Sequence, residues 1–231
     1  MKDHKFMPLI AALVTILPMF VGLILWNRLP DSVPIHFNSM NEVDGYASKS
    51  FAVYWCPIIM LICYGLMRLG LRNKKMNAKY PKVTLAFTWI CPVLSCLIGA
   101  LTYLEALDYN VNSNIIICSF VGVIFIMFGL ALPKIERNSM IGLKFGWTLA
   151  SDANWNFTHR VGRISFIAAG VIFLLCGFCY KVWIVVTAFA VAIVVPYIAS
   201  FAFHKKYGDK DPNAAKKKAK KKAAAKPKKL N

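Results

Sequence analysis

The sequence predicts an all-α integral membrane protein with about six transmembrane helices and a short structured outer loop between the first and second helix. Hydrophobic residues make up 58% of the 231 residues, and they are gathered in long blocks separated by polar, turn-rich segments. This block pattern is typical of a membrane protein rather than a soluble domain. Unpaired backbone groups are costly in lipid, so each block long enough to cross the bilayer must be helical.

Six blocks approach the roughly 20 apolar residues that one crossing needs. They cover residues 6–26, 51–71, 83–104, 115–132, 164–180 and 182–203. The first block follows Lys2 and Lys5, as the apolar part of a signal peptide would. It is long, however, and no small-residue cleavage site follows it, so we interpret it as a retained helix.

Positive charge is concentrated in alternate connections between the blocks. Segments 68–82 and 134–163 are strongly basic, whereas 27–50 and 105–114 carry as many or more acidic side chains than basic ones. Because Lys and Arg in short loops stay on the cytoplasmic side, we expect both termini in the cytoplasm. The segment between the first two helices then faces outward.

We expect three regions along the chain: an N-terminal two-helix unit at 1–82, a four-helix unit at 83–204 and a disordered cytoplasmic tail at 205–231. Much of the formal net charge of +18 lies in this Lys/Ala-rich tail. A polybasic segment beside a transmembrane helix is attracted to anionic lipids, at about 1 kcal/mol per Lys near the surface. The tail lacks the aromatic and Arg side chains that stack on bases, so we expect no direct nucleic-acid partner.

Catalysis, cofactors and metals are not indicated by the sequence. All seven cysteines fall within the predicted helices, where thiols pack as small apolar groups. The C-x-x-C spacing of Cys176 and Cys179 is interpreted as packing too, because a redox pair needs a polar, accessible thiolate. His36 with nearby carboxylates is a pattern common in polar loops. We therefore expect no catalytic residue, no cofactor, no metal site and no enzyme.

Two polar loops carry the candidate functional residues. In the outer loop, Pro34 and alternating side chains predict an extended piece at 33–38, and Asp44-Gly45 predicts a turn. In the inner loop, Ser151 is a suitable N-cap for the fifth helix. One face of that helix would carry four residues at i, i+3, i+4 and i+7: Trp155, Thr158, His159 and Gly162. From physics alone, Trp147 and Trp155 are interpreted as anchors at the membrane interface.

Both loops resemble motifs of a known family. Segment 29–49, LPDSVPIHFNSMNEVDGYASK, resembles the N-terminal domain of unknown function of SdpI-type bacterial membrane proteins. Segment 132–163, LPKIERNSMIGLKFGWTLASDANWNFTHRVGR, is similar to the second motif of that family. The matching outer positions are His36, Phe37, Asn38, Asp44, Gly45 and Tyr46. The matching inner positions, with Lys144 where the family has Arg, are Asn138, Gly142, Lys144, Trp147, Thr148, Leu149, Trp155, Thr158, His159 and Arg160.

The sequence departs from the family pattern at several places. Asn41 and Ala47 stand where glycines are usual, and Phe145-Gly146 stands where Thr-Pro is usual. At the position of Lys144 the change from Arg removes a planar fork that binds a carboxylate or phosphate through two hydrogen bonds.

The resemblance implies a multi-pass protein of the bacterial cell membrane that gives immunity against a secreted antimicrobial peptide. It also implies toxin sensing, with a cytosolic transcriptional repressor held at the membrane. The outer motif would then face the extracellular toxin peptide, and the inner motif would be the docking surface for the repressor.

Other functions stay open beside this one. The alternatives are a secondary transporter, and a lipid- or peptide-binding membrane protein without catalysis. Transport is less favoured because the helix centres lack the ionisable residues that coupled carriers usually place there. A purely structural role is also open for single residues: the His36 ring would hydrogen-bond Asp44 or a carbonyl in a turn, and residues 158–160 would fasten the start of the fifth helix.

Overall fold

The computed structural model describes residues 6–38, 40–70, 80–139, 141–179 and 181–208. Within these residues, six helices are long and apolar enough to cross a membrane, and the only sheet among them is a two-stranded one. The predicted all-α membrane class is therefore confirmed. The basic connection at 71–79 and the Lys-rich segment at 209–231 lie outside the described residues.

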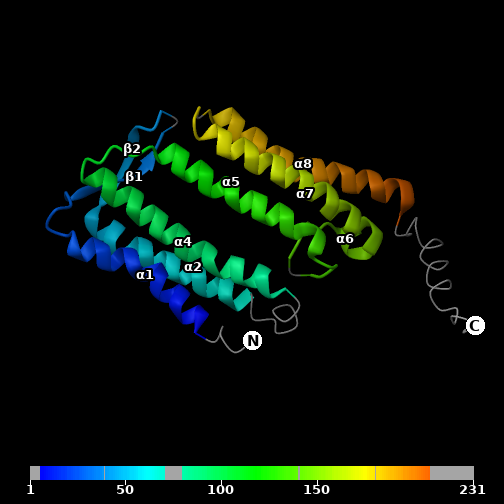
Figure 1. Ribbon diagram of the computed structural model, residues 1–231, viewed down its shortest axis with the longest axis horizontal. Coiled ribbons are helices and arrows are strands. Elements are labelled where there is room, and N and C mark those ends of the chain that lie inside the picture. Colours follow the sequence, from blue (N-terminus) through cyan, green and yellow to red (C-terminus); the bar gives the residue numbers. More distant parts are fainter. Residues whose placement is uncertain (1–5, 39, 71–79, 140, 180, 209–231) are drawn as a thin grey trace, which may run out of the picture. The chain divides into compact units, whose positions relative to one another are not determined.

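Figure 1 shows these helices as long coiled ribbons, with the small sheet beside the end of α4. The long helices are α1 (Met7–Ile24), α2 (Cys56–Gly70), α4 (Pro81–Ala106), α5 (Ser113–Ala131), α7 (Asp152–Cys176) and α8 (Val182–Tyr207). The shorter elements are β1 (Ser32–Phe37), β2 (Val43–Ser48), the π-helix η1 (Phe51–Trp55), the 3-10 helix η2 (Leu132–Lys134) and α6 (Gly146–Ala150).

The fifth long helix differs most from its predicted range of 164–180. It begins at Asp152, directly after Ser151, whose side chain accepts a hydrogen bond from the backbone N–H of Asn154 as an N-cap does. The predicted N-cap is therefore confirmed. The helix ends at Cys176, so Cys179 lies beyond it and is exposed, in contrast to the expectation that every cysteine is helical.

The contacts within the chain divide it into two compact units, Met1–Ile116 and Ile117–Asn231. We call them unit 1 and unit 2 and describe each separately. The sequence suggested a boundary after residue 82, which falls in the first turn of α4. In the structure, α4 packs against α1 and α2 and belongs to unit 1.

Proline determines how α1 and α4 meet in unit 1. Pro18 lies inside α1 and has no N–H, so the carbonyl of Val14 loses its usual partner within the helix. The thiol of Cys96 donates to this carbonyl at 3.4 Å, and the hydroxyl of Tyr103 donates to the Pro18 carbonyl at 3.0 Å. A Cβ on Gly99 would lie 2.6 Å from the Cβ of Pro18, so glycine permits the close approach.

The outer loop folds into an antiparallel hairpin of β1 and β2, residues 32–48, at one end of unit 1. The predicted extended piece is present, but the turn predicted at Asp44-Gly45 is wrong. Both residues lie in β2, and the chain reverses at 38–42, where the N–H of Asn38 donates to the carbonyl of Glu42 at 2.9 Å. Asn41 adopts φ 64°, a left-handed conformation that asparagine tolerates better than most residues.

Unit 2 has a continuous aromatic and small-residue core. Its buried members are Cys118, Leu132, Phe166, Ala169, Phe173, Ala188 and Ala192. The ring of Phe125 lies 5.3 Å, centroid to centroid, from each of Phe166, Phe173 and Phe189. A Cβ on Gly170 would lie 2.7 Å from the carbonyl oxygen of Gly122, so small residues let α5 and α7 approach closely, as is usual between membrane helices.

Candidate functional sites

The hairpin presents a hydrogen-bonded pair of His36 and Asp44 on its surface. The Nδ1 atom of His36 lies 2.5 Å from Oδ1 of Asp44, with the side chains 70% and 45% exposed. A carboxylate can only accept, so Nδ1 carries the proton and donates. Gly45 pairs with His36 across the sheet, and a Cβ there would come within 2.8 Å of the His36 Cβ. Glycine is therefore needed at this position for clearance between the strands.

The hairpin tip is held by two asparagines. The Oδ1 atom of Asn38 accepts from two backbone N–H groups of the turn, and its Nδ2 donates to Oε2 of Glu42 at 3.0 Å. Asn41 donates through Nδ2 to the carbonyl of Val111 at 3.0 Å and accepts through Oδ1 from the N–H of Asn114 at 3.3 Å. The hairpin is thus tied to the connection between α4 and α5.

An ion pair lies at the base of the hairpin. Nζ of Lys49 lies 2.9 Å from Oδ1 of Asp31 and 5.1 Å from the centre of the Trp26 ring. The hydrogen bond from Lys49, followed by its charge, lowers the pKa of Asp31 below its ordinary value. Of the two aromatic residues in the outer motif, Tyr46 is exposed and Phe37 is half-buried. The exposed surface of the hairpin therefore combines polar side chains with the apolar or aromatic side chains of Ile35, Met40 and Tyr46.

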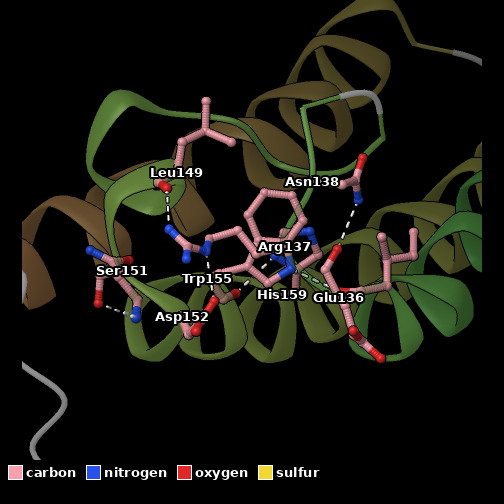
Figure 2. Close-up of polar contacts among 10 residues, drawn as sticks. Glu136, Arg137, Asn138, Leu149, Ser151, Asp152, Trp155 and His159 are labelled. Carbon is pink, nitrogen blue, oxygen red and sulfur yellow. Dashed lines mark hydrogen bonds and ion pairs between the residues drawn. The ribbon is translucent and has the colours of Figure 1, made fainter.

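In unit 2, Asn138 organises the segment between η2 and α6. Its Oδ1 accepts from the N–H of Ile141 at 2.8 Å, while Nδ2 lies 2.8 Å from the carbonyl of Glu136 and 3.1 Å from that of Ile141. Figure 2 shows the contact with Glu136. One side chain thereby satisfies backbone groups on both sides of the turn.

His159 and Trp155 form the buried centre of what we call the loop site: Asn138, Gly142, Trp147, Thr148, Trp155, Thr158 and His159. Trp155 is 0% exposed, and its ring stacks on His159 with centroids 4.1 Å apart. The Trp155 Nε1 atom donates to the carbonyl of Ile135 at 2.8 Å. The interpretation of Trp155 as an interfacial anchor is therefore wrong, because its indole is enclosed by protein and its N–H is satisfied there.

The contacts of His159 define its tautomer. Nδ1 lies 2.8 Å from the carbonyl of Trp155, which can only accept, and Nε2 lies 3.3 Å from the N–H of Leu143, which donates. The ring is therefore neutral and protonated on Nδ1. Gly142, adjacent to Leu143, has φ 128°, and a Cβ there would lie 2.5 Å from Nε2 of His159. Glycine is required at 142 by both its backbone conformation and the space available.

Thr148 and Lys144 hold the loop that leads into α6. Oγ1 of Thr148 accepts from the N–H of Phe145 at 2.8 Å, and its own proton can reach the carbonyl of Phe145 or Leu143. Lys144 is exposed, and its Nζ donates to the carbonyl of Ser139 at 3.2 Å. Thr148 is buried, so this hydroxyl stabilises the loop from within.

A buried polar chain joins α6, α7 and α8. Nε1 of Trp147 donates to Oγ of Ser200 at 2.8 Å, and this hydroxyl donates to Oδ1 of Asn154 at 2.9 Å. Thr158 donates to the same Oδ1 at 2.9 Å, and Nδ2 of Asn154 donates to the Ser200 carbonyl at 3.2 Å. Sequence reasoning missed Ser200 and Asn154. The signal at Ser200 is a buried stripe of small residues four apart on α8, Ala188, Ala192, Pro196 and Ser200.

Arg137 is a third residue that sequence reasoning missed. Its Nε donates to Oδ1 of Asp152 at 2.6 Å and its NH1 to the carbonyl of Leu149 at 2.5 Å, as Figure 2 shows. Asp152 also places negative charge in the first turn of α7, where a helix favours it. The side chain of Arg160, by contrast, is exposed on α7 and does not join the buried centre.

The described residues contain no group of three or more His, Cys, Asp or Glu side chains placed to hold a metal. In both sites the polar atoms are engaged mainly with one another and with the backbone. The hairpin is a braced, exposed surface, and the loop site is a hydrogen-bonded scaffold with exposed Lys and Arg side chains around it, at 134, 144, 160 and 163.

The fold and these two sites define a multi-pass α-helical membrane protein. Two family models match the chain. One, a domain of unknown function called DUF1648, covers residues 13–61 and includes the hairpin, and the SdpI/YfhL protein family covers residues 134–200 and includes most of unit 2. The chain is thus a multi-pass bacterial membrane protein that is similar to the SdpI family.

A curated relative supports this assignment over most of the chain. Immunity protein SdpI of Bacillus subtilis (strain 168) is 26% identical over 201 residues, which cover 86% of this chain and 96% of the relative. No solved structure matches. The chain is therefore similar to an immunity protein along nearly its whole length.

Proposed function

We propose that the protein gives the cell immunity against a secreted antimicrobial peptide, which contacts the hairpin. The observation that carries this proposal is the braced hairpin with its exposed His36 and Asp44 pair, in a chain similar to an immunity protein. A rigid polar surface loses little conformational entropy when it binds, which favours recognition. This function needs no catalysis by the chain.

The proposed orientation places the hairpin outside. Successive crossings alternate in direction, so the hairpin after α1 and the loop site after α5 lie on opposite sides of the membrane. Exposed Lys and Arg side chains around the loop site, at 134, 144, 160 and 163, favour the cytoplasmic side for that end. Both termini are then cytoplasmic.

A second candidate function is signalling to a cytosolic repressor at the loop site. Arg160 and Arg163 are exposed on α7, and the opposite, buried face of this helix belongs to the loop site. These cations favour an acidic protein partner. Peptide binding outside would alter docking inside only if it favours one packing of the helices over another. Lys144 and the Lys-rich tail are proposed to act on the same side, the tail with anionic lipids.

Survival of a sensitive strain tests the immunity proposal. The strain lacks its own immunity gene, expresses this chain and is titrated with secreted killing peptides. Wild type should protect, and the His36→Ala, Asp44→Ala double variant should lose protection at equal membrane abundance. Asn110→Ala, an exposed loop position, is the control. If the wild-type chain protects against none of the peptides, the immunity proposal is wrong, and transport or lipid binding becomes the favoured function.

A further inference from the structure

Unit 1 contains a cavity that neither site uses. It has a volume of about 190 Å³ and lies at the hairpin end of the unit, between α1, β1, η1, the start of α2 and α4. We call it the hairpin-end cavity. Its wall on α4 is made of Ser95, Ile98, Gly99 and Thr102, which lie at i, i+3, i+4 and i+7 on one helix face. At 1.5 Å rise per residue this wall is about 10 Å long.

The opening of the cavity lies beside the hairpin. Among its lining residues Ile35 and Phe51 are exposed, at 45% and 39%, and both belong to the hairpin end. The deeper residues Pro18, Pro57 and Ser95 are buried. Phe51 begins the π-helix η1, and such segments occur frequently at functional sites. A ligand would therefore enter past the hairpin.

The lining selects an apolar occupant. Apart from two hydroxyls, at Ser95 and Thr102, the lining side chains are hydrocarbon or thiol groups. The Ser95 hydroxyl already donates to the carbonyl of Thr15 at 2.7 Å, so its proton is not available to a ligand. A cavity of roughly 150 Å³ lined by apolar side chains holds one benzene-sized molecule. The hairpin-end cavity is of similar size and suits one aromatic or branched aliphatic group.

We propose that the hairpin-end cavity receives one bulky apolar side chain of an extracellular peptide. This inference rests on the proposed function, since it requires the hairpin to face outside. Ile35 lines the cavity and is the extra residue of an irregularity in β1, between Pro34 and His36, where the regular alternation of side chains is interrupted. A peptide with its side chain in the cavity would therefore lay its polar groups beside the His36 and Asp44 pair. A buried apolar anchor with a polar rim is the usual anatomy of a protein interface.

The dimensions favour a side chain over a lipid tail. Half of a hydrocarbon core about 30 Å thick is roughly 15 Å, which is longer than the α4 wall of the cavity. The close approach of α1 and α4 at Pro18 and Gly99 also narrows the cavity on the α1 side. The occupant that fits is therefore short and enters from the hairpin.

Protection of Cys56 tests the proposal on the native chain. Cys56 lines the cavity, whereas Cys63 lies two turns further along α2 and is exposed. The full chain in nanodiscs is alkylated with N-ethylmaleimide, and mass spectrometry follows each cysteine separately. N-acetyl-phenylalanine amide should slow the alkylation of Cys56. At an amide concentration ten times the dissociation constant, mass action requires the rate to fall about tenfold. The same amide should leave the alkylation rate of Cys63 unchanged. N-acetyl-aspartate amide, which is polar, should slow the alkylation of neither cysteine.

Several outcomes would overturn the proposal. Equal slowing at both cysteines would mean only that the amide partitions into the lipid. A Cys56 that reacts at the same rate with and without the amide would show that the cavity takes no such group. Cys56→Phe should abolish binding of the amide, and Cys63→Phe is its matched control. Phospholipid retained in native mass spectra by wild type and Cys63→Phe, but lost from Cys56→Phe, would assign the cavity to a lipid chain.

This readout needs no survival assay. If the amide does not protect Cys56, the cavity proposal is wrong but the immunity proposal is unaffected. Conversely, if the amide protects Cys56 but the chain gives no immunity, the cavity binds apolar groups and this binding is unrelated to a toxin.

Discussion

Replacing Gly142 by alanine tests whether the loop site is held by the tight contact between the loop and α7. The backbone there has φ 128°, and a Cβ would lie 2.5 Å from Nε2 of His159 and 2.9 Å from ring carbons of Trp155. The disfavoured conformation costs about 1 to 3 kcal/mol. Overpacking costs about 1 to 3 kcal/mol more. The total is about 2 to 6 kcal/mol.

Gly146→Ala is a matched control four residues away. Nothing lies within 4 Å of a Cβ at Gly146, and this residue begins α6. Alanine there should be neutral or should stabilise the helix by about 0.5 to 1 kcal/mol. Thermal unfolding of the purified chain in lipid nanodiscs, followed by far-UV circular dichroism, compares the two variants. Equal unfolding temperatures for Gly142→Ala and Gly146→Ala would refute the reasoning.

A double-mutant cycle separates the steric contribution from the backbone contribution. His159→Ala removes the imidazole that the new Cβ would strike, but it leaves the N–H of Leu143 without its partner. The double variant with both changes should lose less unfolding free energy than the two single variants lose together. The difference should be about 0.5 to 3 kcal/mol. Additive changes would mean that only the φ angle matters at Gly142.

Three other predictions follow from single contacts. Ser200→Ala should destabilise by about 1 to 3 kcal/mol in thermal unfolding, because buried polar groups lose their partner, whereas the exposed Thr187→Ala on the same helix should change stability by less than about 0.5 kcal/mol. Arg137→Lys should speed hydrogen exchange in α6, since lysine cannot contact a carboxylate and a carbonyl in one planar arrangement; unchanged exchange would contradict the bridging role. The Asp31 pKa is lowered by Lys49, so this pair stabilises the hairpin above the unfolded-state pKa of Asp31 and the effect is lost as pH falls through the folded-state value. Lys49→Gln should raise the Asp31 pKa toward its unfolded-state value, so the acid-dependent loss of hairpin protection from hydrogen exchange should be smaller than in wild type. An equal loss in both proteins would contradict the pairing.

Local information in the sequence was sufficient for the architecture of the helices. The apolar blocks predicted six crossings, because block length alone decides whether a helix can span lipid. Ser151 predicted the start of α7, and the spacing of Trp155, Thr158 and His159 predicted a shared face, all of which the structure contains. The hairpin was expected as an extended piece, yet its turn was misplaced. Asp44-Gly45 has the composition of a turn, but both residues lie in β2. Glycine is needed at 45 because a Cβ there would clash with His36 on the neighbouring strand.

The tertiary structure alone decided which polar groups meet. Asn154 and Ser200 are 46 residues apart, and only the packing of α7 against α8 brings them to 2.9 Å. The burial of Trp155 and the cavity beside Ile35 likewise arise from side chains supplied by several elements. In a membrane helix the faces toward lipid and toward protein are both apolar, so the hydrophobic pattern does not distinguish them. The sequence by itself determined the six helices of the described residues that are long and apolar enough to cross a membrane, and the packing of those helices determined which of their side chains meet.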